Sequence, residues 1–133
     1  MKREELIKLI DSLELDKEEF WILSSGSLVL RNLLEEAGDL DIAVTQKGLD
    51  ELYKKYNVVP KGNNWYKICS NIECVLDTKD SSKYEKVGNY NLLSLNEYYK
   101  FLKKSTREKD KVKLDIVKRA LINLEKNDKI ISR

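Results

Sequence analysis

Hydrophobic positions recur along the chain at the spacings of helices and strands. The segment 3–15 carries the stripe of an amphipathic helix, formed by Leu6, Leu9, Ile10 and Leu13. The apolar run 20–23 and the alternating segment 40–44 predict two strands, because alternation gives a strand one apolar and one polar face. Between these strands, the leucine spacing of the segment 28–37 predicts a helix that Gly38 ends.

The middle of the chain predicts one helix followed by short strands. Leu49 to Tyr56 fits a helix with one apolar side, and the valines at 58–59 begin a strand that the turn signal 60–63 ends. The apolar runs 65–69 and 72–77 flank a two-residue turn and therefore predict a hairpin.

The last part of the chain predicts a loop and two helices. Thr78 to Asn89 is polar, so we expect a long mobile loop there. Ser94 fits the N-cap of a helix ending at Lys104, with Glu97 at the capping-box position. The segment 109–124 predicts a final helix whose inward residues are Val112, Ile116, Val117, Ala120 and Leu124.

The order of these elements favours an α/β or α+β fold, in which a mixed β-sheet is flanked by helices and followed by a C-terminal helical segment. A chain of 133 residues is one domain's worth of sequence. We therefore expect a single domain over residues 1–133, with an α/β core in residues 1–93 and helices in residues 94–133.

Composition narrows the chemistry. The chain has no histidine, which excludes a Ser-His-Asp triad and any His-ligated zinc site. Its two cysteines, Cys69 and Cys74, lie near the predicted hairpin and are expected to be reduced packing residues. The N-terminal segment lacks the apolar core of a secretion signal and no long apolar run follows, so we expect a cytoplasmic protein with no membrane partner.

Two carboxylates stand out in the strand predicted at 40–44. Side chains at positions i and i+2 of a strand share a face, so Asp39 and Asp41 are expected side by side. At about 6 Å and an effective dielectric of about 20, their repulsion is roughly 3 kcal/mol. A hard divalent cation such as Mg²⁺ removes that cost, and two solvated aspartates at an exposed strand end are the alternative.

The stretch Ser25-Gly26-Ser27 precedes a predicted helix and follows an apolar strand. Free backbone N–H groups and the positive end of the helix dipole make such a position suitable for an anion. Gly26 would let a phosphate approach the backbone, and Ser27 would donate a hydroxyl or cap the helix. An anion cradle beside a cation site suits a metal-bound nucleoside triphosphate.

A third acid is expected from the strand predicted at 72–77. Its alternation puts Glu73 and Asp77 on one face, and either could join the aspartate pair if this strand adjoins theirs. Phosphoryl transfer uses such a carboxylate to hold metal or to deprotonate the attacking hydroxyl. We favour Glu73, because Asp77 lies at the boundary of the predicted loop. An edge strand with acids on its wet side is the alternative.

The sequence Gly26-Ser27, a helix, and then Asp39-Leu40-Asp41 resembles the signature of the nucleotidyltransferase fold of the DNA polymerase beta superfamily, particularly its small members. The segment 72–75 looks like the strand that carries the third acid of that superfamily, and the segments 92–98 and 107–110 are similar to the tail of small uncharacterised members.

The resemblance implies a role for each candidate residue. Gly26 and Ser27 would hold the triphosphate, Asp39 and Asp41 would bind Mg²⁺ or Mn²⁺, and Glu73 would be the third ligand or the base. The third acid is more often Asp in the superfamily. The acceptor is not implied, because larger relatives bind it with added domains; a small molecule, an RNA or a protein all fit, as does a homodimer that completes the acceptor pocket.

The C-terminal segment is locally basic, through Lys103, Lys104, Arg107, Lys109, Lys111, Lys113, Lys118 and Arg119. Arg107 and Lys109 could reach the phosphates of the nucleotide, whereas solvated helix surface is the alternative. The leading hypothesis is a metal-dependent nucleotidyltransferase that uses a nucleoside triphosphate. Its rivals are a catalytically silent nucleotide-binding or antitoxin-like module, and a nucleic-acid-binding protein that uses these basic helices.

Overall fold

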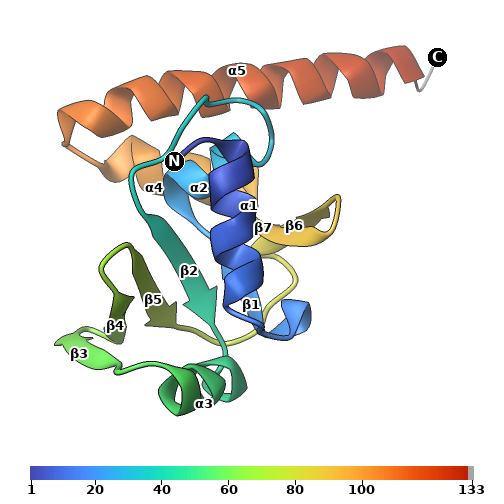
Figure 1. Cartoon of the computed structure of the whole chain (residues 1–133). Helices are drawn as coiled ribbons and strands as arrows, with labels where there is room; N and C mark the ends of the chain where they lie inside the picture. Colours follow the sequence, from blue (N-terminus) through green and yellow to red (C-terminus); the bar gives the residue numbers. More distant parts are fainter. Residues whose placement is uncertain (132–133) are drawn as a thin grey trace. The chain divides into compact units, whose positions relative to one another are not determined.

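A computed structural model describes the backbone of residues 1–131 and the side chains of residues 1–126 (Figure 1). The chain divides into two compact units, Met1–Leu93 and Ser94–Arg133, which we call the sheet unit and the helix-pair unit. That both belong to one domain stays a prediction.

The sheet unit contains a seven-stranded mixed sheet in the order β3-β4-β5-β2-β1-β7-β6. The strands are β1 Phe20–Ile22, β2 Leu40–Val44, β3 Val59–Gly62, β4 Trp65–Cys69, β5 Ile72–Leu76, β6 Tyr84–Val87 and β7 Tyr90–Leu93. The helices are α1 Arg3–Ser12, the 3₁₀ helix η1 Lys17–Glu19, α2 Ser24–Val29 and α3 Gln46–Lys55. The β2–β5 and β1–β7 pairs are parallel and the others antiparallel, so the predicted α/β class with a mixed sheet is confirmed.

One hydrophobic core joins the sheet to its helices. Alternate residues of β2 lie in a buried cluster with residues of the three α-helices, among them Leu6, Ile10, Val29, Leu40, Ile42, Val44, Leu49 and Leu52. Each fully buried side chain of this size contributes about 1.5–3 kcal/mol. The helices thus cover the sheet face that carries Leu40. Asp41, the polar residue of β2, points to the other face.

The helix predicted at 28–37 is wrong in its position. The structure places α2 at Ser24–Val29, and Gly38 ends no helix. The chain leaves the helix after Leu30. Asn32 then takes a φ of +61°, in the left-handed region that often terminates helices. Irregular chain then runs to Ala37, whose N–H donates to the carbonyl of Met1 at 2.9 Å.

Two other boundaries also differ from the predictions. The polar segment 78–89 is not one long loop, because it contains β6, and β6 pairs with β7 through a turn at Gly88. The ring of Tyr84 stacks on that of Trp21 at 5.0 Å between centroids, which anchors this edge strand. β3 continues to Gly62, so the turn that follows it falls on residues 63–64.

The helix-pair unit consists of α4 Leu95–Lys104 packed against α5 Glu108–Ile131. The predicted cap is confirmed, since the Ser94 hydroxyl accepts the N–H of Glu97 at 3.1 Å. Val117 and Ala120 are buried as predicted and Ile116 is partly buried, but Val112 and Leu124 are exposed.

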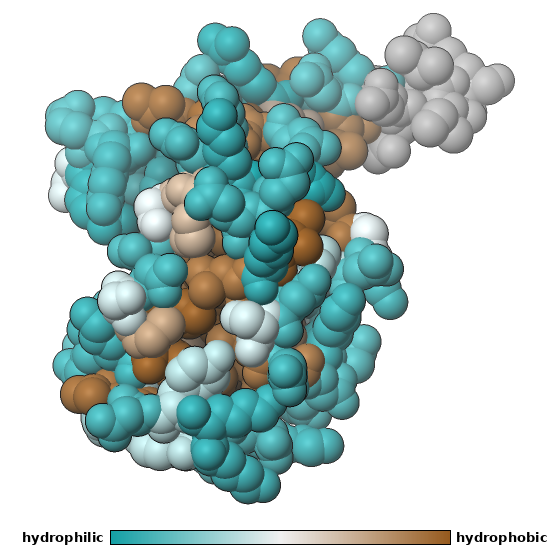
Figure 2. Space-filling view, viewed as in Figure 1, coloured by the Kyte–Doolittle hydropathy of each residue, from teal (hydrophilic) through white to brown (hydrophobic). Residues whose placement is uncertain are grey.

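Charged residues leave the molecule largely hydrophilic on the face drawn in Figure 2. Across the described part of the chain, none of the helices combines the length and apolar character that crossing a membrane requires.

Candidate functional site

The candidate site lies at the end of the sheet where β1 finishes and where β2 and β5 begin. Ile22, the last residue of β1, pairs with Ile42 in the antiparallel β1–β2 ladder. The N–H of Leu23 then donates to the carbonyl of Asp41 at 2.9 Å. The start of α2 is therefore tied to the strand that carries this aspartate. We call this end of the sheet, defined by Leu23, Asp41 and Glu73, the site edge.

Asp41 and Glu73 are direct neighbours at the site edge. They are register partners in the parallel β2–β5 pair, and both are only partly buried. Strands lie about 4.8 Å apart, so paired residues carry their side chains on the same face. Like charges placed opposite each other destabilise a sheet unless a cation compensates them.

Lys61 supplies such a cation. Its ammonium nitrogen lies 2.6 Å from Oε1 of Glu73, with side-chain exposures of 44% for Lys61 and 30% for Glu73. Lys67 of β4 is the register partner of Glu73 on the other side of β5. Glu73 therefore sits between an acid and two lysines, and the ion pair with Lys61 is open to solvent.

Asp39 is placed differently from Asp41. It lies in the bend just before β2 and is exposed, while the N–H of the following Leu40 donates to the carbonyl of Asn71 at 2.9 Å. The rule that i and i+2 share a face holds only within a regular strand. Among the residues whose side chains are described, no three Asp, Glu or Cys side chains group closely enough to hold a metal ion. A metal role for Asp39, Asp41 and Glu73 stays a prediction.

Asp77, the other candidate for the third acid, lies at the opposite end of the sheet. Its N–H donates to the carbonyl of Val44, the last residue of β2, at 2.9 Å. Its carboxylate accepts from the ammonium of Lys83 at 2.8 Å. Of the two candidates, only Glu73 is therefore beside Asp41.

The residues Ser25, Gly26 and Ser27 form the first turn of α2 instead of a turn ahead of it. Ser27 is fully buried, and its hydroxyl donates to the carbonyl of Ser24 at 2.7 Å. A Cβ on Gly26 would lie 3.0 Å from the side chain of Ile22, so glycine lets α2 pack closely on β1. Packing thus explains Gly26, and the buried hydroxyl of Ser27 points into the helix turn.

The start of α2 keeps two features of a binding site. The helix has no side-chain cap at its N-terminus, and by helix geometry its first amides lack carbonyl partners within the helix. Ser24 has a φ of +52°, a conformation that is strained for a residue other than glycine. Strain of this kind is concentrated at functional sites.

Arg107 and Lys109 belong to the helix-pair unit. Nε of Arg107 lies 2.8 Å from the carboxylate of the buried Asp110, and Lys109 is exposed. That either residue reaches a phosphate of the substrate stays a prediction.

Sequence reasoning missed three charged residues that the structure ties to their surroundings. Lys61 was assigned to a turn, although it follows the apolar start of β3. The side chain of Arg31 is 7% exposed and donates to the carbonyl of Leu93 at 2.9 Å and to Glu85, while burial lowers the pKa of its guanidinium. Asp110 is buried in a helix whose other charged residues, among those with described side chains, are exposed or partly exposed. None of the three was marked by a pattern in the sequence.

No known protein family, curated protein or solved structure matches the chain. The function of the site edge is therefore argued from its own residues. Two neighbouring carboxylates, a lysine and an uncapped helix start together form a polar site at one end of the sheet.

Proposed function

We propose that the chain is a nucleotidyltransferase that uses Mg²⁺ or Mn²⁺ to transfer a nucleoside monophosphate from a nucleoside triphosphate to a hydroxyl acceptor. The observation that carries this proposal is the register of β2 and β5, which sets Asp41 opposite Glu73 where β1 leads into α2. The same order of strand, helix start and acid-bearing strand is the basis of the resemblance to the DNA polymerase beta superfamily.

Two carboxylates support this proposal, because Asp41 and Glu73 are register partners on one sheet face and hard divalent cations take carboxylate oxygens as ligands. Asp39 and Asp41 would hold the ion, and Glu73 would be the third ligand. When bound, the ion neutralises charge on the triphosphate. The uncapped amides at the start of α2 are suited to donate hydrogen bonds to a phosphate oxygen.

In the proposed reaction, the oxygen of the acceptor hydroxyl forms a bond to the α-phosphorus, the bond from that phosphorus to the bridging oxygen breaks, and pyrophosphate leaves. The hydroxyl proton passes to a carboxylate, for which Glu73 is the candidate base. Lys61, beside Glu73, would hold the carboxylate in place and balance its charge.

Titration calorimetry with Mg²⁺ and each nucleoside triphosphate tests the proposal. We expect Asp41→Asn to weaken metal-dependent nucleotide binding and to slow transfer about a hundredfold or more. Asp50→Asn is the control, because Asp50 is an exposed acid that accepts a hydrogen bond from Gln46 on α3. Equal metal and nucleotide binding by wild type and Asp41→Asn would show that Asp41 holds no metal.

A second candidate function is a nucleotide-binding module without turnover. The ion pair between Lys61 and Glu73 favours it, because a lysine already occupies one side of the third acid. This candidate predicts that the full chain binds the triphosphate but releases no labelled pyrophosphate with any hydroxyl acceptor. Release of pyrophosphate that depends on Glu73 would exclude it.

A further inference from the structure

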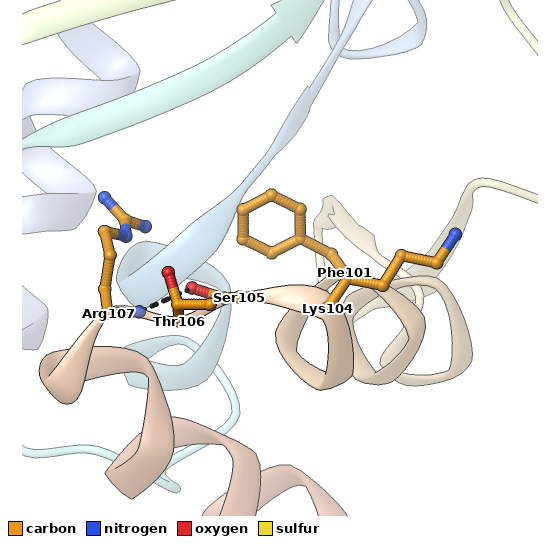
Figure 3. A pocket seen from close by; sticks show the side chains of 5 residues that line it. All are labelled: Phe101, Lys104, Ser105, Thr106 and Arg107. Carbon is orange, nitrogen blue, oxygen red and sulfur yellow. Dashed lines mark hydrogen bonds between the residues drawn. The ribbon is translucent and has the colours of Figure 1, made fainter.

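The turn between α4 and α5 forms a cavity that the proposed transfer chemistry does not use. It has a volume of about 300 Å³ and is lined by Phe101, Lys104, Ser105, Thr106 and Arg107 (Figure 3). Figure 3 shows the ring of Phe101, the hydroxyl of Thr106 and the guanidinium of Arg107 projecting to the same side of the turn. We call these five residues the turn pocket.

The buried carboxylate of Asp110 holds two residues of the turn pocket in place. Asp110 is 2% exposed, and its Oδ2 accepts the hydroxyl of Ser105 at 2.6 Å and Nε of Arg107 at 2.8 Å. The Ser105 hydroxyl also accepts the backbone N–H of Arg107 at 3.3 Å. These bonds hold the arginine side chain in one orientation, so the entropy of ordering it is already lost before any ligand arrives.

Arg107 is oriented so that part of its guanidinium is exposed to solvent. Its pair with Asp110 runs through Nε, and its side chain is 56% exposed. A guanidinium presents paired donors in a planar fork, which matches two oxygens of a phosphate or carboxylate. Lys104 also lines the pocket, but Figure 3 shows its ammonium pointing away from Arg107. The guanidinium of Arg107 therefore favours an anion as the ligand.

Phe101 gives the turn pocket an aromatic surface. It is 55% exposed, although a large apolar side chain gains by burial. Its ring lies 6.5 Å from the tilted ring of Tyr98, which is 2% exposed and so gives it a fixed neighbour. An exposed ring with a fixed neighbour is a surface on which a nucleobase can stack.

We propose that the turn pocket is a nucleotide-binding site, with the phosphate on Arg107 and the base on Phe101. A plain anion leaves the ring of Phe101 unused, and an apolar ligand leaves the exposed part of the Arg107 guanidinium unused. A nucleotide satisfies both groups at once. The nucleotide is either free or the terminal residue of a single-stranded RNA, which carry the same phosphate and base.

The residues that line the turn pocket all belong to the helix-pair unit, and Asp41 belongs to the sheet unit. The proposal is therefore tested in the full chain carrying Asp41→Asn, which lacks one of the proposed metal ligands. Binding of AMP, adenosine, inorganic phosphate and a short oligoadenylate is measured by titration calorimetry. The two variants are Arg107→Ala and Phe101→Ala. Circular dichroism checks that each variant keeps its helix content.

Matched controls come from α5. Arg119 makes the same type of pair, from Nε to the carboxylate of Asp115 at 3.1 Å, but both side chains are exposed. Arg119→Ala therefore removes the same charge outside the turn pocket. Val112→Ala removes an exposed apolar side chain that does not line it.

We expect AMP to bind tighter than phosphate or adenosine, and each pocket variant to weaken AMP binding about tenfold, as loss of a stacking partner does. The control variants should bind AMP as the parent chain does. Oligoadenylate binding tighter than AMP and falling steeply with salt identifies an RNA end as the source, and equal binding identifies the free nucleotide. AMP affinity that is absent, or unchanged in Arg107→Ala and Phe101→Ala, overturns the proposal whether or not transfer occurs at the site edge.

Discussion

Asp110 gives the sharpest test of how the helix-pair unit is held together, through the substitution Asp110→Asn. The asparagine keeps the shape of the side chain, and its amide oxygen can still accept from Ser105 and Arg107, because both bonds end on the same oxygen. What the substitution removes is the negative charge. The loss of stability then measures the charge alone and not the packing.

The magnitude follows from the two hydrogen bonds. A hydrogen bond to a charged group contributes about 1.5–3 kcal/mol, and a neutral one about 1 kcal/mol. Two such bonds would lose about 1–4 kcal/mol in total. Because Arg107 is 56% exposed, water screens its attraction to Asp110, and we expect the lower part of the range, about 1–2 kcal/mol.

The pH dependence gives a second, independent check. Burial by itself would raise the pKa of Asp110, but the hydrogen bonds from Ser105 and Arg107 outweigh it, so the pKa is lowered. The unfolded carboxyl titrates near pH 3.9. The contribution of Asp110 is therefore complete above about pH 4 and is lost as the pH falls through the lowered pKa of the folded state.

Urea denaturation of the full chain, followed by circular dichroism, measures the free energy of unfolding at pH 7 and at about pH 2. The gap between wild type and Asp110→Asn should be present at pH 7 and should close at the acidic pH, because other carboxyls titrate alike in both proteins. Asp115→Asn, which removes an exposed partner of Arg119, should change stability by less than about 0.5 kcal/mol. A gap absent at pH 7, or undiminished in acid, would refute the reasoning.

Two further predictions concern the sheet unit. Gly48→Ala should destabilise the protein by about 1–3 kcal/mol in urea, because the added Cβ would lie 2.8 Å from the carbonyl oxygen of Glu19. Gly38→Ala, with nothing within 4 Å, is its control and should unfold like wild type. Burial raises the pKa of the Cys74 thiol to about 12, so at pH 8 Ellman's reagent should label the native chain only at the partly exposed Cys69. Simultaneous labelling of both cysteines would contradict this.

The strands were predictable wherever one face meets the core. In the segment 40–44, Leu40, Ile42 and Val44 share one buried face, while on the other face Ala43 is buried and Asp41 is partly buried. In the hairpin of 65–69 and 72–76, the buried residues are Ile68, Ile72 and Cys74. A register shift of one residue would turn the apolar residues to the polar face, so the pattern specifies both the element and its orientation. The helix predicted at 49–56 is likewise present, as part of α3.

The helix α2 was misplaced because tertiary contacts override its leucine spacing. Leu28, Val29 and Leu30 are buried in succession, whereas the helical pattern assigned the same segment one buried stripe. Arg31 then enters the protein to reach the carbonyl of Leu93, a partner 62 residues away. No local pattern carries information about such a partner. The edge strand β6 was missed for the complementary reason, since charged residues suit both an exposed edge and a loop.

The candidate site was predictable only as a set of residues. Sequence spacing named Asp41 and Glu73, but their pairing depends on β5 lying beside β2, which the order of strands along the chain does not fix. Lys61 reaches Glu73 across β4, which lies between β3 and β5 in the sheet order. The ion pair at the site edge is therefore a consequence of topology.

The ion pair of Lys61 with Glu73 and that of Arg107 with Asp110 differ in which partner a ligand can reach. This difference suits each pair to a different kind of ligand. At the site edge neither side chain is buried, with exposures of 30% for Glu73 and 44% for Lys61, so an incoming cation can compete with the lysine for the carboxylate. In the turn pocket the acid is 2% exposed and the arginine 56% exposed, so only the cation is offered to a ligand. Under the two proposals above, the sheet unit would supply oxygen ligands to a metal, and the helix-pair unit would supply hydrogen-bond donors to a phosphate.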